Sequence, residues 1–182
     1  MGTDYQDKLV ELLQRSALKD REYVASRLDD QTISARGTRI RHVAARKLGK
    51  LGGPGVAKRL ELLLEDPDWH MRQEAALALG QVGDPRVVPS LVRLGDDEVW
   101  QVRAAAGGSL DEIGDVRGTP IWIRLLEEQP HLNRFAVRAL RTHGDARGVE
   151  PLRRAAAERS FLSGLRYRHA AWAITRRARA HD

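Results

Sequence analysis

The chain has 182 residues, of which 42% are hydrophobic and 31% are charged, and its net charge is +6. These proportions are typical of a folded, water-soluble domain and argue against a disordered chain. The sequence has no cysteine, which excludes disulfides, thiolate metal sites, iron–sulfur clusters and cysteine nucleophiles.

The N-terminal residues and the apolar runs bear on localisation. The start, MGTDYQD, has no basic segment followed by an apolar one, as a signal peptide would. No apolar run approaches the length needed to cross a bilayer. We therefore expect a cytoplasmic protein that does not contact a membrane.

Charge is distributed in blocks along the chain. Residues 31–59 hold eight Lys or Arg and no Asp or Glu, whereas residues 60–128 hold six and fourteen. Residues 129–182 are basic again, with twelve and four. An acidic middle thus separates two basic regions, a pattern that the net charge hides.

One sequence pattern recurs every thirty-one residues. It reads RHVAARKLGKLGG at 41–53, RQEAALALGQVGD at 72–84 and RAAAGGSLDEIGD at 103–115. A copy one residue shorter follows at 134–145, and a looser copy lies at 166–178. Repetition on this scale predicts stacked copies of one supersecondary unit.

Each junction between copies is followed by a further helical pattern. Residues 54–66 and 85–94, for example, place apolar side chains three to four positions apart, which predicts a helix with one buried face. Gly and Asp at the junctions suit the left-handed end of one helix and the cap of the next. Pro54 and Pro85 fit the first turn of the helix that follows.

The motif V-R-x-x-A-A-x-A-L-G-x-[IV]-G-D-x-R-x-V-x-P-L, clearest across 71–91 and 102–126, resembles the HEAT repeat. It is most similar to the short form found in the phycobilin-lyase-like HEAT family. We predict an all-α fold, an α/α solenoid of about five helix pairs in one domain spanning 1–182. The expected elements are a capping helix at 4–17 and pairs near 20–51, 54–82, 85–113, 116–143 and 146–178. Residues 31–38 are expected to form an extended connection within the first pair.

In HEAT solenoids the second helix of each pair lines the concave face, so the resemblance implies that its variable positions contact the partner. The candidate partner-binding residues are Arg39, His42, Arg46, Trp69, His70, Gln73, Trp100, Gln101, Arg134, Arg138, Arg168 and Trp172.

Tryptophans occupy one of these positions in two successive repeats. Trp69 and Trp100 are thirty-one residues apart, so we expect them to stack side by side as aromatic anchors for a partner. The alternative is that each covers a groove between repeats as part of the core. Trp122 is equivalent to Leu91, a core position, and is expected to pack there.

The arginines fall into two sets. One set recurs at a single repeat position, whose side chains in HEAT proteins usually bond turn groups, and is interpreted as structural: Arg41, Arg72 and Arg103. The other set lies outside that position and could bind an anionic partner: Arg39, Arg46, Arg138, Arg168 and Arg176.

Catalytic patterns find little support. No serine lies in a nucleophile elbow, and no H-x-x-x-H or H-E-x-x-H motif offers a zinc site. HEAT-fold hydroxylases hold iron through His-Glu pairs, and no His-Glu dipeptide occurs. HEAT-like DNA glycosylases pair a Trp with an Asp one helical turn later, where this chain has Gln73 and Ala104. We therefore expect no catalytic residue, metal or cofactor.

The leading hypothesis is a non-catalytic adaptor that presents its concave helical surface to a protein partner. The first alternative is nucleic-acid binding by the concave arginines, with a DNA glycosylase as its remote form. The second is a phycobilin-lyase-like protein, as the repeat resemblance implies. The oligomeric state is left open, including self-association through the opposite charge blocks.

Overall fold

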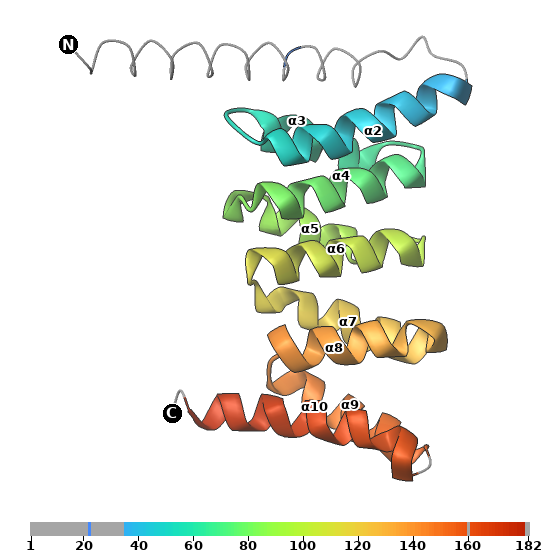
Figure 1. Cartoon of the computed structure of the whole chain (residues 1–182), viewed down its shortest axis with the longest axis vertical. Coiled ribbons are helices and arrows are strands. Elements are labelled where there is room, and N and C mark those ends of the chain that lie inside the picture. The colour runs from blue at the N-terminus through green and yellow to red at the C-terminus, as the bar shows by residue number, and fades with distance from the viewer. Residues whose placement is uncertain (1–21, 23–34, 160, 181–182) are drawn as a thin grey trace, which may run out of the picture. The chain divides into compact units, whose positions relative to one another are not determined.

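A computed structural model describes residue 22, residues 35–159 and residues 161–180. The expected capping helix at 4–17 and nearly all of the first helix of the first pair lie outside these residues. Figure 1 shows the succession of helices along the chain. They are α2 (Ala35–Leu51), α3 (Val56–Leu62), α4 (Trp69–Val82), α5 (Val88–Leu94), α6 (Trp100–Ile113), α7 (Thr119–Glu128), α8 (Asn133–His143), α9 (Val149–Ala157) and α10 (Phe161–Arg179). Short 3-10 helices occupy Leu63–Glu65, Pro85–Val87, Val116–Gly118, Pro130–Leu132 and Ala146–Gly148. Every regular element in the described part of the chain is a helix, which confirms the predicted all-α helical-repeat fold.

The chain divides into two compact units, residues 1–82 and residues 83–182. In the first unit α2 packs along α4, and α3 contacts both. In the second unit α5, α7 and α9 are the first helices of their pairs, and α6, α8 and α10 are the second helices (Figure 1). There α7 lies between α6 and α8, and α10 packs on both α8 and α9. The expectation of a single domain stays a prediction.

The core of each unit is built from the leucine and alanine positions of the repeat. Leu48 and Leu79 in the first unit, and Leu110, Leu140 and Ile174 in the second, are at most 1% exposed. Burying one such side chain contributes on the order of 2 kcal/mol. Because they recur once per repeat, they account for the period that the sequence shows.

Small residues let the two long helices of the first unit approach closely. A Cβ added at Gly49 of α2 would lie 2.7 Å from the Cα of Ala78 on α4. Real Cβ atoms do not approach a backbone atom so closely, and the two helices could not pack in this way around a larger residue.

The Gly-Asp junctions act as predicted at two places. Gly83 and Gly114 adopt left-handed conformations, with φ of 68° and 84°. The Asp that follows accepts a hydrogen bond from the backbone N–H two residues later, as Asp84 does from Arg86 at 2.9 Å. Gly144 differs, with φ of −64° and ψ of 149°, although it follows its leucine position by four residues, as Gly83 and Gly114 do.

Two local predictions were wrong. Helix α2 begins at Ala35, so residues 35–38 are helical and not part of an extended connection. No proline interrupts this segment, and Ala and Arg favour helix strongly enough to offset the cost of Gly37. Pro54 precedes its helix, because Gly55 intervenes in a left-handed conformation and α3 starts at Val56. Pro85, by contrast, opens its 3-10 helix as expected.

Candidate functional site

Two of the recurring arginines, Arg72 and Arg103, hold the turns that precede their own helices. Arg72 donates through Nη1 to the carbonyl oxygens of Asp66 (2.9 Å) and Pro67 (3.3 Å). Arg103 donates to the two equivalent carbonyls of its own turn at 2.9 and 3.1 Å. Arg41 instead reaches the carboxylate of Asp66, at 2.7 Å. The structural interpretation of this arginine position is confirmed by these bonds.

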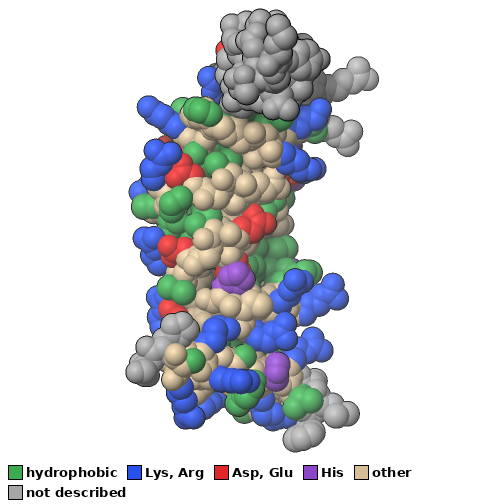
Figure 2. Space-filling model, turned by 60° about the vertical axis from the view of Figure 1, so that its left-hand side comes forward, with side chains coloured by type: hydrophobic (Ala, Val, Ile, Leu, Met, Phe, Trp, Pro, Cys, Tyr) green, Lys and Arg blue, Asp and Glu red, His purple; other side chains and the backbone are tan. Residues whose placement is uncertain are grey.

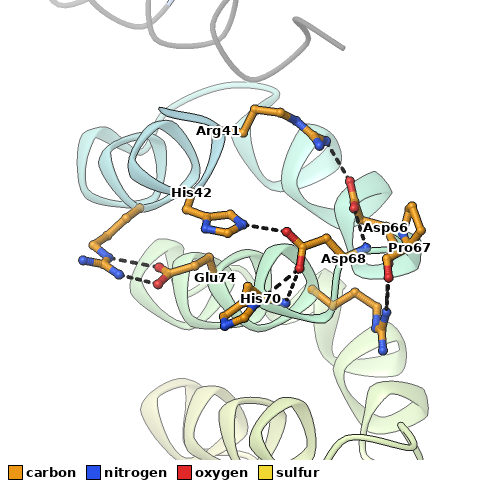
Figure 3. A network of polar contacts seen from close by, with 9 residues as sticks. Arg41, His42, Asp66, Pro67, Asp68, His70 and Glu74 are labelled. Carbon is orange, nitrogen blue, oxygen red and sulfur yellow. Dashed lines mark hydrogen bonds and ion pairs between the residues drawn. The ribbon is translucent and has the colours of Figure 1, made fainter. Parts of the chain in front are cut away.

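Two candidate histidines share one carboxylate at the start of α4 (Figure 3). His42 Nε2 on α2 lies 3.0 Å from Oδ2 of Asp68. His70 Nδ1 lies 3.4 Å from the other oxygen of the same carboxylate, Oδ1. The two imidazole rings are 5.8 Å apart between centroids. Asp68 therefore links the second helices of successive repeats.

Asp68 is held in place because it also caps α4. Its Oδ1 accepts from the backbone N–H of His70 at 3.0 Å, and its own N–H donates to the carboxylate of Asp66 at 2.9 Å. Burial acts to raise the pKa of Asp68, but the hydrogen bonds from the His70 backbone and the His42 ring outweigh it and lower that pKa below its ordinary value. The carboxylate thus stays charged and available to both rings at neutral pH.

The next arginine on this surface is already paired. Arg46 forms a two-pronged contact with the carboxylate of Glu74, including an Nε–Oε2 hydrogen bond of 3.0 Å (Figure 3). Glu74 is 14% exposed at its side chain, whereas Arg46 is 56% exposed. An arginine with a bidentate carboxylate partner is poorly placed to attract a second anion.

Apolar side chains stand among these polar pairs. The indole of Trp69 stacks on His70 with 3.5 Å between ring centroids, and Trp69 remains partly exposed. Val43 is 49% exposed and Leu77 is 38% exposed. We call this surface of the first unit the α2–α4 face: His42, Val43, Arg46, Trp69, His70, Gln73 and Leu77.

Trp100 occupies the equivalent position in the second unit. It begins α6, as Trp69 begins α4, and like Trp69 it is half-buried. Its ring meets His131 edge-on, with 4.9 Å between centroids. The neighbouring Gln101 is also half-buried. Since the two tryptophans belong to different units, their expected side-by-side stacking stays a prediction.

The remaining candidates gather on two adjacent helices of the second unit. Arg134 and Arg138 lie one turn apart on α8, and Arg168 and Trp172 lie one turn apart on α10, all four exposed. Figure 2 shows Lys and Arg side chains crowding the lower part of the molecule, where these helices lie. We call this surface the α8–α10 face: Arg134, Phe135, Arg138, Leu165, Arg168, His169, Trp172 and Arg176.

Aromatic rings and arginines are interleaved on the α8–α10 face. Trp172 is 55% exposed, with the guanidinium of Arg176 5.3 Å from its ring centroid. The imidazole ring of His169 stacks with the indole of Trp172, with 5.8 Å between ring centroids. Phe135 is 49% exposed, with Arg134 5.0 Å from its ring. Exposed rings next to cations are the contacts that anionic, planar ligands prefer.

Trp122 packs in the core, as predicted, and is 7% exposed. Its Nε1 donates to Oδ2 of Asp111 at 2.9 Å. Burial raises the pKa of Asp111 to about 6, despite the opposing effects of the His143 charge and of the Trp122 hydrogen bond. The pair belongs to the packing of α6 on α7.

The structure thus places most of the candidates on two surfaces, while Trp100 and Gln101, at the start of α6, belong to neither. His42, Arg46, Trp69, His70 and Gln73 come together on the first unit, and Arg134, Arg138, Arg168 and Trp172 on the second. The side chain of Arg39 lies outside the described residues.

Sequence reasoning missed four side chains that shape these surfaces. Asp68 bonds the His42 ring and Glu74 bonds Arg46, and Phe135 and Leu165 add apolar area to the α8–α10 face. The Asp before Trp69 was a visible signal, since that residue type caps helices. The other three occupy helix positions that periodicity alone leaves between core and surface.

Among the described residues, no group of three or more His, Asp or Glu side chains is arranged to hold a metal ion. None of the helices in the described part of the chain is both long and apolar enough to span a membrane.

Comparison with known proteins agrees with the geometry. The family described as HEAT repeats matches residues 30–111, and no curated protein matches the chain. Among solved structures, the complex of CpcE and CpcF of phycocyanin lyase from Nostoc sp. PCC7120 is similar, with a TM-score of 0.66 and 22% identity. The match covers 86% of this chain and 65% of that one, so this chain spans less than two thirds of its length. Residues 30–111 therefore resemble HEAT repeats, and the chain has a helical-repeat fold.

Proposed function

We propose that this chain is a non-catalytic adaptor that holds a protein partner on its α2–α4 face. The observation that carries the proposal is the combination of exposed apolar side chains with charges that are already paired. Val43 and Leu77 are exposed and Trp69 is partly exposed, while Arg46 is bound to Glu74 and the His42 ring to Asp68.

Such a surface suits another protein better than a strongly charged ligand. Protein interfaces have aromatic and aliphatic anchors at the centre and satisfied polar groups around them. Because the ion pairs form before the partner arrives, less side-chain freedom is lost on binding and fewer charges must be matched. The partner is accordingly a protein surface with apolar side chains and little net charge.

The fold similarity supports a binding role. The similar structure from Nostoc is a complex of two proteins, CpcE and CpcF. Helical repeats of this kind expose an extended set of second-helix side chains, which serve as a surface for partners in many unrelated systems.

The test begins with the full chain as bait in a lysate of its source and identification of the captured protein. The affinity of that purified protein for wild type and variants is then measured by calorimetry. Leu77→Arg places a charge on the α2–α4 face, where Leu77 is 38% exposed, and should weaken binding by about tenfold or more. Leu62→Arg is the matched control, since Leu62 is 74% exposed on α3, a first helix.

The control should bind like the wild type, and all three proteins should share one circular dichroism spectrum. A partner that binds Leu77→Arg as tightly as wild type would refute this placement of the interface. Binding through this face should also depend weakly on salt, because its charges are paired within the chain.

A lyase-like role is the second candidate, and the similarity of fold to the phycocyanin lyase complex is what favours it. A free bilin titrated into the purified chain should then change its absorption spectrum on binding. A spectrum that equals the sum of the separate components, at concentrations of about 10 µM, would remove this candidate.

A further inference from the structure

The α8–α10 face is built from two helices that are rich in arginine. Helix α8 carries three arginines and α10 carries five, and neither helix contains an Asp or a Glu. The two helices pack against each other within the second unit. A surface built from them therefore has a positive potential that neither helix offsets.

The carboxylates of the described segment 129–180 contact arginines other than those of this face. Asp145 bonds Arg147 in the turn before α9, with an Nε–Oδ1 distance of 3.0 Å. Glu150 lies 3.8 Å from Arg153. The third acid, Glu158, lies 4.0 Å from Arg159. These are the acidic residues of the described segment 129–180.

Some arginines of these helices are structural and are not counted as ligands. Arg177 donates to the carbonyl oxygens of Arg141 and Gly144 and ties α10 to the end of α8. The arginines that point outward are a different group, with one turn between Arg134 and Arg138 along α8. Arg176 stands one turn beyond Trp172 on α10.

The exposed rings narrow the choice of ligand. Trp172 and Phe135 are about half exposed, which costs free energy in a surface that binds nothing apolar. Each ring has a guanidinium beside it, from Arg176 and Arg134 respectively. A ligand that fits both features carries negative charges and flat, stackable groups in alternation.

We propose that the α8–α10 face binds single-stranded nucleic acid. Phosphates contact the guanidinium groups of Arg134, Arg138 and Arg176, and bases stack on Trp172 and Phe135. Guanidinium groups recognise phosphate oxygens in a bidentate manner and also stack on bases. The strand must be single, because bases in a duplex are paired and stacked within the helix and do not reach protein rings.

An acidic segment of a protein is the competing ligand class. Carboxylates would pair with the arginines, but they would leave the two rings without a stacking partner. Single-stranded nucleic acid uses both kinds of side chain, so the observations favour it. Ribose and deoxyribose strands share this chemistry, and the experiment includes both.

The experiment measures fluorescence anisotropy of labelled oligo(dT) and oligo(rU), about twenty nucleotides long, with the full chain at low salt. Polyglutamate and a duplex of equal length are the competitors. We expect binding in the micromolar range, and the logarithm of the affinity should fall linearly with the logarithm of the salt concentration.

Two variants separate the phosphate contacts from the stacking. Arg134→Gln with Arg138→Gln removes two phosphate contacts and should lower the slope of the salt dependence by about 1.4. Trp172→Leu should weaken binding by about tenfold and leave that slope unchanged. Oligonucleotide should quench part of the tryptophan fluorescence of the wild type, and this quenching should be absent in the Trp172→Leu variant.

The control removes the same formal charge elsewhere in the second unit. Arg86→Gln with Arg117→Gln alters two exposed turn arginines that bond Asp84 and Asp115, and it should bind like wild type. The proposal is overturned if oligonucleotides fail to bind at about 10 µM protein and low salt. It is also overturned if the control loses as much affinity as the α8 variant, or if polyglutamate or the duplex binds as well as the single strand.

Discussion

The two units carry the same repeat but treat their second-helix arginines in opposite ways. In the first unit Arg46 is bound by Glu74 of the following repeat. In the second unit the equivalent arginine is Arg138, and the residue in the position of Glu74 is His169. One repeat position therefore decides whether the arginine is neutralised within the chain or left to attract an anionic ligand. If both proposals hold, the units differ in the ligand that they bind more than in their fold.

This difference lies at positions that the core does not constrain. The alanine and leucine positions are the same in both units because packing requires them. Glu74 is partly buried and His169 is exposed. The repeat position that they share therefore lies at the edge of the core, where many residue types fit. Function in such repeats is thus encoded one residue away from the residues that encode the fold.

The largest expected difference in stability between the units concerns Arg103 and its counterpart in the first unit, Arg72. Arg103 is 4% exposed and bonds two turn carbonyls and Glu128, whereas Arg72 is half-buried. Arg103→Met should destabilise the protein by about 3 kcal/mol, because buried carbonyl groups and a carboxylate lose their donor.

Arg72→Met should cost about 1 kcal/mol, since water can replace a half-buried donor. Urea denaturation followed by circular dichroism measures both values. Equal losses for the two variants would contradict the prediction. They would show that this arginine position contributes equally to stability in the two units, although Arg103 is buried and Arg72 is half-buried.

Replacing a glycine by alanine gives a second comparison between the units. The change in stability is expected to have opposite signs in the two units. A Cβ at Gly49 would lie 2.7 Å from Ala78, whereas a Cβ at Gly108 on α6 meets no atom within 4 Å. Gly49→Ala should destabilise the first unit by about 2 kcal/mol through overpacking. Gly108→Ala should stabilise the second by up to about 1 kcal/mol, because alanine restricts the unfolded chain and favours helix.

Thermal unfolding of both variants under one set of conditions measures the two shifts. A Gly49→Ala variant as stable as wild type would mean that α2 and α4 can separate at no cost.

The sequence predicted the fold well because the fold depends on residues with a strict period. Leu48, Leu79 and Leu110 recur thirty-one residues apart and are all buried. Capping by Asp after Gly was also predictable, since one residue type performs it in each repeat. The start of α2 was missed although Ser34, a residue type that often caps helices, stands directly before Ala35 in the sequence.

The surfaces were predictable only in part. Repeat register placed Arg138 and Trp172 on second helices, which the structure confirms. Register could not show that Glu74 binds Arg46, because that pair depends on side-chain conformations across two helices. The contact of Trp100 with His131 was missed for the same reason.

A pH dependence should distinguish the second unit from the first. Asp111 has a raised pKa of about 6 and lies against Trp122, whereas the equivalent residue of the first unit is Gly80. A folded-state pKa above the unfolded value means that the charged carboxylate destabilises the fold above pH 6, and that stability rises as pH falls through 6 toward 4.

Asp111→Asn should therefore stabilise the protein at pH 8 by about 1 kcal/mol, a value reduced for the partial exposure of the carboxyl group. The gain should vanish below about pH 4. Melting temperatures between pH 4 and 8 measure it, with Glu112→Gln as a control that removes a neighbouring charge and should show a much flatter profile. A gain that does not change with pH would mean that Asp111 is not the titrating group.

The smallest effect on stability should come from exchanging the residues that make the units differ. Glu74→His frees the exposed Arg46 from its carboxylate, and His169→Glu places a carboxylate in the same register beside Arg138. Each change should alter the free energy of unfolding by about 0.5 kcal/mol or less, because ion pairs at exposed arginines contribute little.

Ligand binding should respond far more strongly to these two changes than stability does. His169→Glu should lower the affinity for single-stranded oligonucleotide by about fivefold and reduce its salt dependence, since one guanidinium is neutralised within the chain. Glu74→His should leave that affinity within about twofold, because the α2–α4 face gains a cation without gaining stacking rings of the α8–α10 kind. The opposite result would be that Glu74→His alone makes the α2–α4 face bind oligonucleotide as strongly as the α8–α10 face. The affinity would then depend on unpaired arginines and not on exposed aromatic rings, and the two faces would differ in net charge only.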